Sequence, residues 1–291
     1  MNNSIRYLLV TILNVVITLA EFIGGLASGS LALLSDAVHN LSDVGSIVLA
    51  YIANLISRRK QNSSKTFGYK RAEIIAAFIN GVILIGISIY LFVEAIGRFS
   101  APQPIHGKLM FIVSLIGLIS NLVSMIIMLG KAKNNLNAKA MFLNMASDTL
   151  SSVAVVIGSI VISIWNITII DPILTMLAAV MLFGEAIKVT QKAIAILMES
   201  NLDIDLNQVK TSILTYDEVE RVHHMHVWQY SDDMIMIEAH LNVDPELSIK
   251  ELEELYTKIE NTLSKEYGIS HVTLQAECNR GKDEKLLTTG M

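Results

Sequence analysis

The sequence predicts an all-α membrane domain of six transmembrane helices, followed by a small cytoplasmic α+β domain. The chain has 291 residues, of which 52% are hydrophobic, and its mean hydropathy is +0.52. That is too apolar for an ordinary soluble protein of this length. Long apolar runs continue to about residue 198, and charged residues become dense beyond it. We therefore expect a membrane domain over residues 1–200 and a second domain over residues 201–291.

Six apolar segments are long enough to cross the hydrocarbon core, which takes roughly 20 residues. They cover residues 6–28, 31–56, 73–97, 108–130, 140–165 and 171–198. We interpret the first as an uncleaved span, because it is longer than the apolar region of a signal peptide and no small-residue cleavage site follows it.

Basic residues predict the orientation, because Lys and Arg in short loops are retained in the cytoplasm. They gather in two loops on one side: Arg58, Arg59, Lys60, Lys65, Lys70 and Arg71 between spans two and three, and Lys131, Lys133 and Lys139 between spans four and five. The loops on the other side contribute little more than Arg98 and Lys108. Both termini should therefore be cytoplasmic, with the protein integral to the cell membrane.

The tail should form an αββαβ unit. The pattern indicates a helix over 206–216, strands over 222–230 and 234–243, a helix over 248–267 and a strand over 271–277. The polar stretch 230–234 makes the middle strands a hairpin, and Leu252, Leu255, Ile259 and Leu263 form one apolar stripe on the longer helix. A unit of about 80 residues is small for an independent core, so we expect a homodimer to provide further burial.

Two spans carry polar residues at helical spacing. Asp36, His39 and Asp43 share one face of span two, and Asn144 and Asp148 share one face of span five. An ionisable group at this depth costs roughly 2.5–3.5 kcal/mol, which a bound cation would offset. An imidazole, two carboxylates and an amide suit Zn²⁺, while the oxygen-rich set also suits Mn²⁺, Fe²⁺ or Co²⁺. Asp36 is placed to orient His39 from behind.

We expect structural roles for the isolated polar residues in the spans. Asn14, Asn80 and Asn121 are expected to form hydrogen bonds between helices. Glu21 and Asp171 lie near span ends in the sequence, and we interpret both as structural.

Several segments carry a resemblance to a known family. They are SGSLALLSDAVHNLSD, KTFGYKRAEIIAA, NAKAMFLNMASDTLSSVAVV, IIDPILTMLAAVM, HMHVW, EAH and HVTLQAE. With the order of six spans and an αββαβ tail, the chain resembles the cation diffusion facilitator family of metal transporters. The resemblance covers nearly the whole chain and implies a ferredoxin- or metallochaperone-like tail.

The resemblance implies a transport site of His39, Asp43, Asn144 and Asp148. It also implies Zn²⁺ efflux by metal/proton antiport with alternating access, in a homodimer. Asn144 departs from the pattern, because zinc-transporting members usually have histidine there; Mn²⁺, Co²⁺ and Fe²⁺ therefore stay open as substrates.

The family's cytoplasmic metal site maps by position onto His226, His240 and Glu277, with His271 nearby. Cys278, the single cysteine, adjoins Glu277 as a possible extra ligand. We interpret His223 and His224 as ordinary strand histidines. The stretch with Lys65, Tyr69 and Lys70 lacks the histidines that hold metal in many members, which predicts no metal site in that loop.

Other classes of protein fit less well. The sequence has no GxxxxGK[ST] motif, so an ion gradient must supply the energy for transport, and no HExxH motif, so we expect no enzyme. Nothing indicates nucleic-acid binding. The remaining alternative is a membrane-anchored metal sensor, although simple anchors do not need ionisable pairs within the bilayer.

Overall fold

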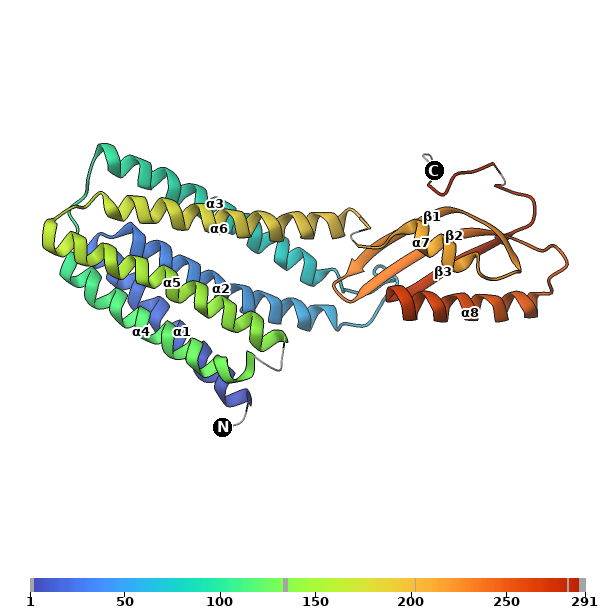
Figure 1. Ribbon diagram of the computed structural model, residues 1–291, viewed down its shortest axis with the longest axis horizontal. Coiled ribbons are helices and arrows are strands. Elements are labelled where there is room, and N and C mark those ends of the chain that lie inside the picture. The colour runs from blue at the N-terminus through green and yellow to red at the C-terminus, as the bar shows by residue number, and fades with distance from the viewer. Residues whose placement is uncertain (1–2, 133–135, 202, 282, 288–291) are drawn as a thin grey trace. The chain divides into compact units, whose positions relative to one another are not determined.

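The computed structural model describes residues 3–132, 136–201, 203–281 and 283–287 (Figure 1). Within these ranges, the side chains of residues 3–13, 127–132, 136–141 and 144 lie outside what it describes. The chain divides into two compact units, one of residues 1–52 and 79–190 and the other of residues 53–78 and 191–291.

Six long helices come first along the chain. They are α1 (Asn3–Ser28), α2 (Leu31–Ser57), α3 (Ala72–Ser100), α4 (Gly107–Ala132), α5 (Leu136–Trp165) and α6 (Ile170–Leu197). Over the described residues, α2 to α6 each contain an apolar stretch long enough to cross a membrane, and α1 contributes a shorter one over Asn14–Ser28. Their bounds fall within a few residues of the predicted spans. The predicted fold class of an all-α membrane domain before a small α+β domain is confirmed.

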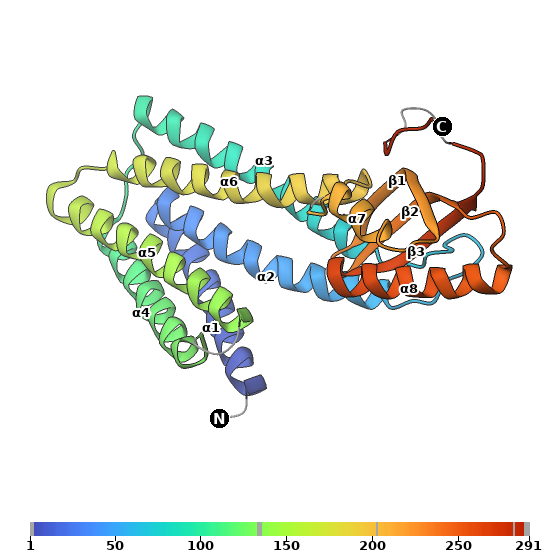
Figure 2. The ribbon, with the colours of Figure 1, turned by 45° about the vertical axis from the view of Figure 1, so that its right-hand side comes forward.

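Polar side chains join neighbouring helices of the first unit. Asn121 on α4 donates to Ser152 Oγ on α5 at 3.0 Å, and Asn80 on α3 donates to Ser46 Oγ on α2 at 2.7 Å. Both asparagines therefore have the interhelical role expected from the sequence. In Figures 1 and 2, α3 and α6 run side by side, as do α4 and α5.

Asp171, at the start of α6, caps the N-terminus of α2. Its Oδ2 accepts from the backbone N–H of Leu31 at 2.8 Å, and its Oδ1 accepts from that of Ala32 at 3.2 Å. Helix α2 lacks intrahelical partners for these N–H groups, and its dipole favours a carboxylate there. The structural role predicted for Asp171 thus fixes the beginning of the helix that carries His39 and Asp43.

The tail consists of α7 (Leu206–Ile213), β1 (Val219–Ser231), β2 (Met234–Val243), α8 (Ile249–Tyr267) and β3 (Ile269–Glu277). Strand β2 lies between β1, which is antiparallel to it, and β3, which is parallel. The parallel pair requires a crossover, which α8 supplies. Leu255, Ile259 and Leu263 of α8 pack with α7 and one face of the sheet. The predicted αββαβ order is confirmed.

Strand β1 contains a bulge at its histidines. His223 pairs with His240, but the next aligned pair is His226 with Glu238, and His224 between them has a φ of 46°. An extra residue in one strand shifts the alternation of its side chains. Val222 and Met225 therefore both face the helix-covered core, and His223 and His226 share the opposite face of the sheet.

Candidate metal sites

The first candidate site lies between α2 and α5. One ligand atom from each of His39, Asp43 and Asp148 lies within 4.8 Å of the other two, and His39 Nε2 is 3.4 Å from Asp148 Oδ1. The four-residue spacing in α2 places His39 and Asp43 on the same face. Asn144, the fourth predicted ligand, precedes Asp148 by one turn of α5, and its side chain lies outside what the structure describes. The structure brings together the other three.

Asp36 ties α2 to α5 directly behind this group. Its Oδ1 accepts from Ser151 Oγ at 3.1 Å and its Oδ2 from Ser152 Oγ at 3.4 Å. The carboxylate thus binds serines of α5, while the role predicted for it in orienting His39 stays a prediction. Ser152 also accepts from Asn121, so α2, α4 and α5 meet in one polar network.

A cavity of about 40 Å³ adjoins the group. It is lined by Ser35, Asp36, His39, Ser147, Asp148, Ser151, Ala178, Met181, Leu182 and Glu185. Glu185 comes from α6, and its charge acts on His39. The sequence analysis missed this residue, although an ionisable side chain near the middle of a span is itself a signal of function.

This site combines one imidazole with carboxylates inside an apolar helix bundle. Such donors bind divalent transition metals when deprotonated, so a metal ion and protons compete for them. The arrangement can therefore hold either a dication or protons, and that exchange is what an antiporter requires.

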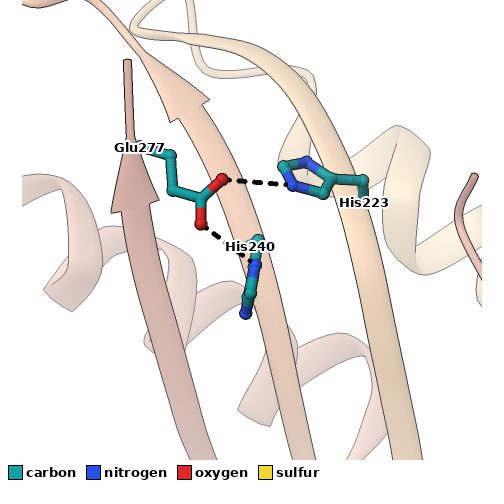
Figure 3. A group of neighbouring side chains, drawn as sticks. All are labelled: His223, His240 and Glu277. Atoms are coloured by element: carbon teal, nitrogen blue, oxygen red, sulfur yellow. Dashed lines mark ion pairs between the residues drawn. The ribbon is translucent and has the colours of Figure 1, made fainter. Parts of the chain in front are cut away.

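The second candidate site lies on the tail sheet, where His223, His240 and Glu277 point toward one another (Figure 3). His223 Nε2 is 3.3 Å from Glu277 Oε2, and His240 Nδ1 is 3.2 Å from Glu277 Oε1. One ligand atom from each residue lies within 4.8 Å of the other two. The residues come from β1, β2 and β3, so adjacent strands position all of them.

Three buried polar atoms of this group lack hydrogen bonds among the described residues. The side chain of His223 is 0% exposed, and within the part of the chain that the structure describes neither of its ring nitrogens has a hydrogen-bond partner, nor does Glu277 Oε2. A buried polar group without a partner costs about 1–3 kcal/mol. A metal ion bound between the three side chains would satisfy Glu277 Oε2 and one ring nitrogen of His223, so these atoms support a metal site here.

Electrostatics keep the ligands in their metal-binding forms. Burial lowers the pKa of His240, although the charge of Glu277 opposes this, so the imidazole is neutral at pH 7. Burial acts to raise the pKa of Glu277, but the hydrogen bond from Gln275 and the nearby histidines outweigh it, so the pKa is lowered. A neutral imidazole and an ionised carboxylate are the forms that bind a cation.

The structure does not bring His226 or His271 into this group. His226 lies opposite Glu238, and its ring centroid is 4.9 Å from that of His224. His271 lies opposite Met236, near the start of β3. It is four residues from Gln275, the partner of His240, a separation of roughly 13 Å along a strand.

His223 takes the place that the sequence predicted for His226. The β1 bulge is the reason, because it turns His223 toward His240. No glycine marks the bulge in VHHMHVW, so the sequence carries no local signal for it. Cys278, considered as an extra ligand, is exposed next to Glu277.

Comparison with known proteins matches two successive regions of the chain to family models. Residues 7–198 match the cation efflux transmembrane domain, and residues 202–278 match the cytoplasmic domain of cation efflux proteins. The chain is 40% identical over 260 residues to the cadmium, cobalt and zinc/H⁺-K⁺ antiporter of Bacillus subtilis, covering 88% of this chain and 83% of that protein.

Two further relatives have similar coverage. The zinc transporter ZitB of Pectobacterium atrosepticum is 37% identical over 286 residues, 97% of this chain and 88% of its own. The metal cation efflux system protein CzcD of Cupriavidus metallidurans is 33% identical over 264 residues, 89% of this chain and 82% of its own. These relatives are transporters, in agreement with the expectation that the chain is no enzyme. The resemblance noted in the sequence is confirmed: the chain belongs to the cation efflux, or cation diffusion facilitator, family of membrane transporters.

Proposed function

We propose that this protein exports Zn²⁺ from the cytoplasm in exchange for protons, by alternating access. The observation that carries the proposal is the convergence of His39, Asp43 and Asp148 between two membrane helices. An imidazole with carboxylates suits tetrahedral Zn²⁺. Relatives named for zinc, cadmium and cobalt support a substrate of this class. Mn²⁺ and Fe²⁺ are the alternatives that an oxygen-rich site favours.

The need for protons follows from the energetics. Moving two positive charges outward against 100 mV costs about 4.6 kcal/mol, and the sequence has no nucleotide-binding motif to supply it. Protons compete with the metal for the same ligands. When the site opens outward, external protons displace the ion, and their return to the cytoplasm drives the cycle.

The tail gives the transporter a second proposed role. With both termini cytoplasmic, His223, His240 and Glu277 would bind metal from the cytoplasm and adjust transport to supply. We also propose a homodimer, which agrees with the naming of the tail's family for dimerisation. The sensing role predicts that removing the tail ligands changes the dependence of transport on metal concentration rather than abolishing transport.

The test is proton flux in liposomes containing the purified protein and a pH-sensitive dye. Zn²⁺, Cd²⁺, Co²⁺, Mn²⁺ and Fe²⁺ are added in turn to the wild type, to Asp148→Ala and to Glu94→Gln. Glu94 is the matched control, because its carboxylate is 43% exposed on α3 and paired with Arg98.

We expect proton flux driven most strongly by Zn²⁺, lost in Asp148→Ala and kept in Glu94→Gln. A larger flux with Mn²⁺ or Fe²⁺ would reassign the substrate. No metal-driven flux with any ion would overturn antiport and favour the membrane-anchored sensor.

A further inference from the structure

Glu21 is a buried acid on α1 that the metal group does not use. The residue is 1% exposed. Its Oε2 accepts a hydrogen bond from Asn40 Nδ2 on α2 at 2.9 Å, while its buried Oε1 has no hydrogen-bond partner among the side chains that the structure describes. The sequence placed Glu21 near a span end in a structural role, but the structure encloses its carboxyl group within the helix bundle.

Helix α4 closes the remaining side of this carboxyl group. At Gly117, a Cβ atom would collide with Glu21 Oε1, so the glycine leaves room for the carboxyl group beside the backbone of α4. The fit shows a built enclosure around the acid. An ordinary side chain at position 117 would displace it.

The charged groups that face Glu21 are themselves acids. Asp36 on α2 and Asp148 on α5 are the groups whose charge acts on it, and α4 has no ionisable residue between Lys108 and Lys131. A carboxylate buried without a cation and next to other carboxylates is strongly disfavoured, and it takes up a proton instead. A dication bound at His39, Asp43 and Asp148 reverses this balance, because a nearby positive charge favours the ionised form.

We propose that Glu21 is a counter-proton carrier of the transporter, separate from the metal ligands. With the metal site empty, its carboxyl group holds a proton. When the dication binds, the O–H bond breaks and the proton leaves to water, so the metal's charge is partly balanced by Glu21. This proposal rests on the proposed function, and it supplies a proton-binding group that the neutral amide of Asn144 does not.

The test counts protons released per Zn²⁺ bound, in purified full-length protein in weakly buffered detergent with a pH dye. Glu21→Gln is the informative variant, because its amide oxygen can still accept from Asn40. We expect it to bind Zn²⁺ and release fewer protons per ion than the wild type, by up to about one. The control Glu94→Gln should match the wild type. Equal release by Glu21→Gln and the wild type would overturn the proposal.

Infrared difference spectroscopy tests the same proton in the wild type, even where Glu21→Gln fails to fold. A protonated carboxyl group gives its own C=O band, and ¹³C-labelled glutamate shifts that band only when a glutamate carries the proton. We expect a label-sensitive band at pH 7 in the metal-free protein that disappears on adding Zn²⁺. The band of the metal-free protein should persist in Glu185→Gln, which excludes Glu185 of the cavity as its source. Absence of the band, or its loss in Glu185→Gln, would overturn the proposal. Absence of transport in liposomes would overturn the proposed function alone.

Discussion

The two candidate metal sites use the same types of ligand on very different supports. The membrane group has one histidine and two carboxylates, and the tail group has two histidines and one carboxylate; within each, the ligand atoms lie within 4.8 Å of one another. The membrane site joins two helices, α2 and α5, which meet through side chains. The tail site joins three neighbouring strands held by backbone hydrogen bonds. Packed helices can shift against one another while a sheet keeps its register, so the membrane site can change geometry and the tail site cannot do so easily.

Their surroundings differ in the same sense. The membrane site adjoins a cavity lined partly by serines, which provides room for water and for an ion in transit. In the tail, the C-terminal segment covers the site: Gly281 lies against the ring of His223, and Met225 N–H donates to Leu286 O at 2.8 Å. The membrane group therefore has an adjoining cavity, whereas the tail group is enclosed.

The largest expected effect is a change that impairs the membrane site and leaves the tail site intact. Asp43→Asn removes a carboxylate from the membrane group, and we expect Zn²⁺ transport to fall by more than about 100-fold, because even partners behind a ligand are worth 10–100-fold in affinity. Zinc bound by the tail should remain, since its ligands are untouched. Metal uptake by vesicles and zinc content after gel filtration measure the two quantities. Transport at the wild-type rate would show that Asp43 is not part of the transport site.

A smaller effect tests the bulge in β1. In the Asp43→Asn background, His223→Ala should weaken zinc binding by the tail by about 10–100-fold, because it removes a donor from a small ligand set. His226→Ala is the matched control and should change the affinity by less than about 3-fold. Competition with a zinc-binding dye gives both affinities. If His226→Ala were the more damaging change, the position inferred from the sequence would be correct.

The difference between His223 and His226 shows which features of the sites can be predicted from the sequence. Helical periodicity is regular, so it was enough to predict that His39 and Asp43 share one face of their helix. That this face meets Asp148 was inferred from the matched polar pairs and the family resemblance. Strand alternation fails where one residue adopts a positive φ, as His224 does at 46°, and a single such residue exchanges His226 for His223. Glu185 was missed for another reason: its approach to the site depends on how α6 packs, which no local pattern encodes.

Glu185 gives the next, moderate effect. Its carboxylate adds negative charge beside His39 without belonging to the closest ligand group. We expect Glu185→Gln to raise the KM for Zn²⁺ by about 3–10-fold, as the loss of roughly 1 kcal/mol of attraction implies. The tail affinity should not change. Transport kinetics in vesicles measure KM, and an unchanged KM with lower kcat would indicate instead that Glu185 moves protons.

The smallest expected effect concerns the protonation of His240 in the tail site. Burial lowers the pKa of His240 below its ordinary value of 6.5, while the charge of Glu277 opposes this. Glu277→Gln should therefore lower the pKa of His240 further. NMR titration of histidine-labelled, metal-free protein measures the pKa of His240 in the wild type and in Glu277→Gln. A pKa at or above 6.5 in the wild type would contradict the buried environment.

The same shift links pH to the stability of the tail. Because the folded pKa of His240 lies below the unfolded value of 6.5, the unfolded state binds more protons just below that pH. The free energy of unfolding should then rise with pH through this window and reach its full value above 6.5. Denaturant unfolding of the metal-free tail within the full-length protein, followed near Trp228, should show a lower midpoint at pH 5.5 than at pH 7. Excess Zn²⁺ should reduce the difference by holding His240 unprotonated.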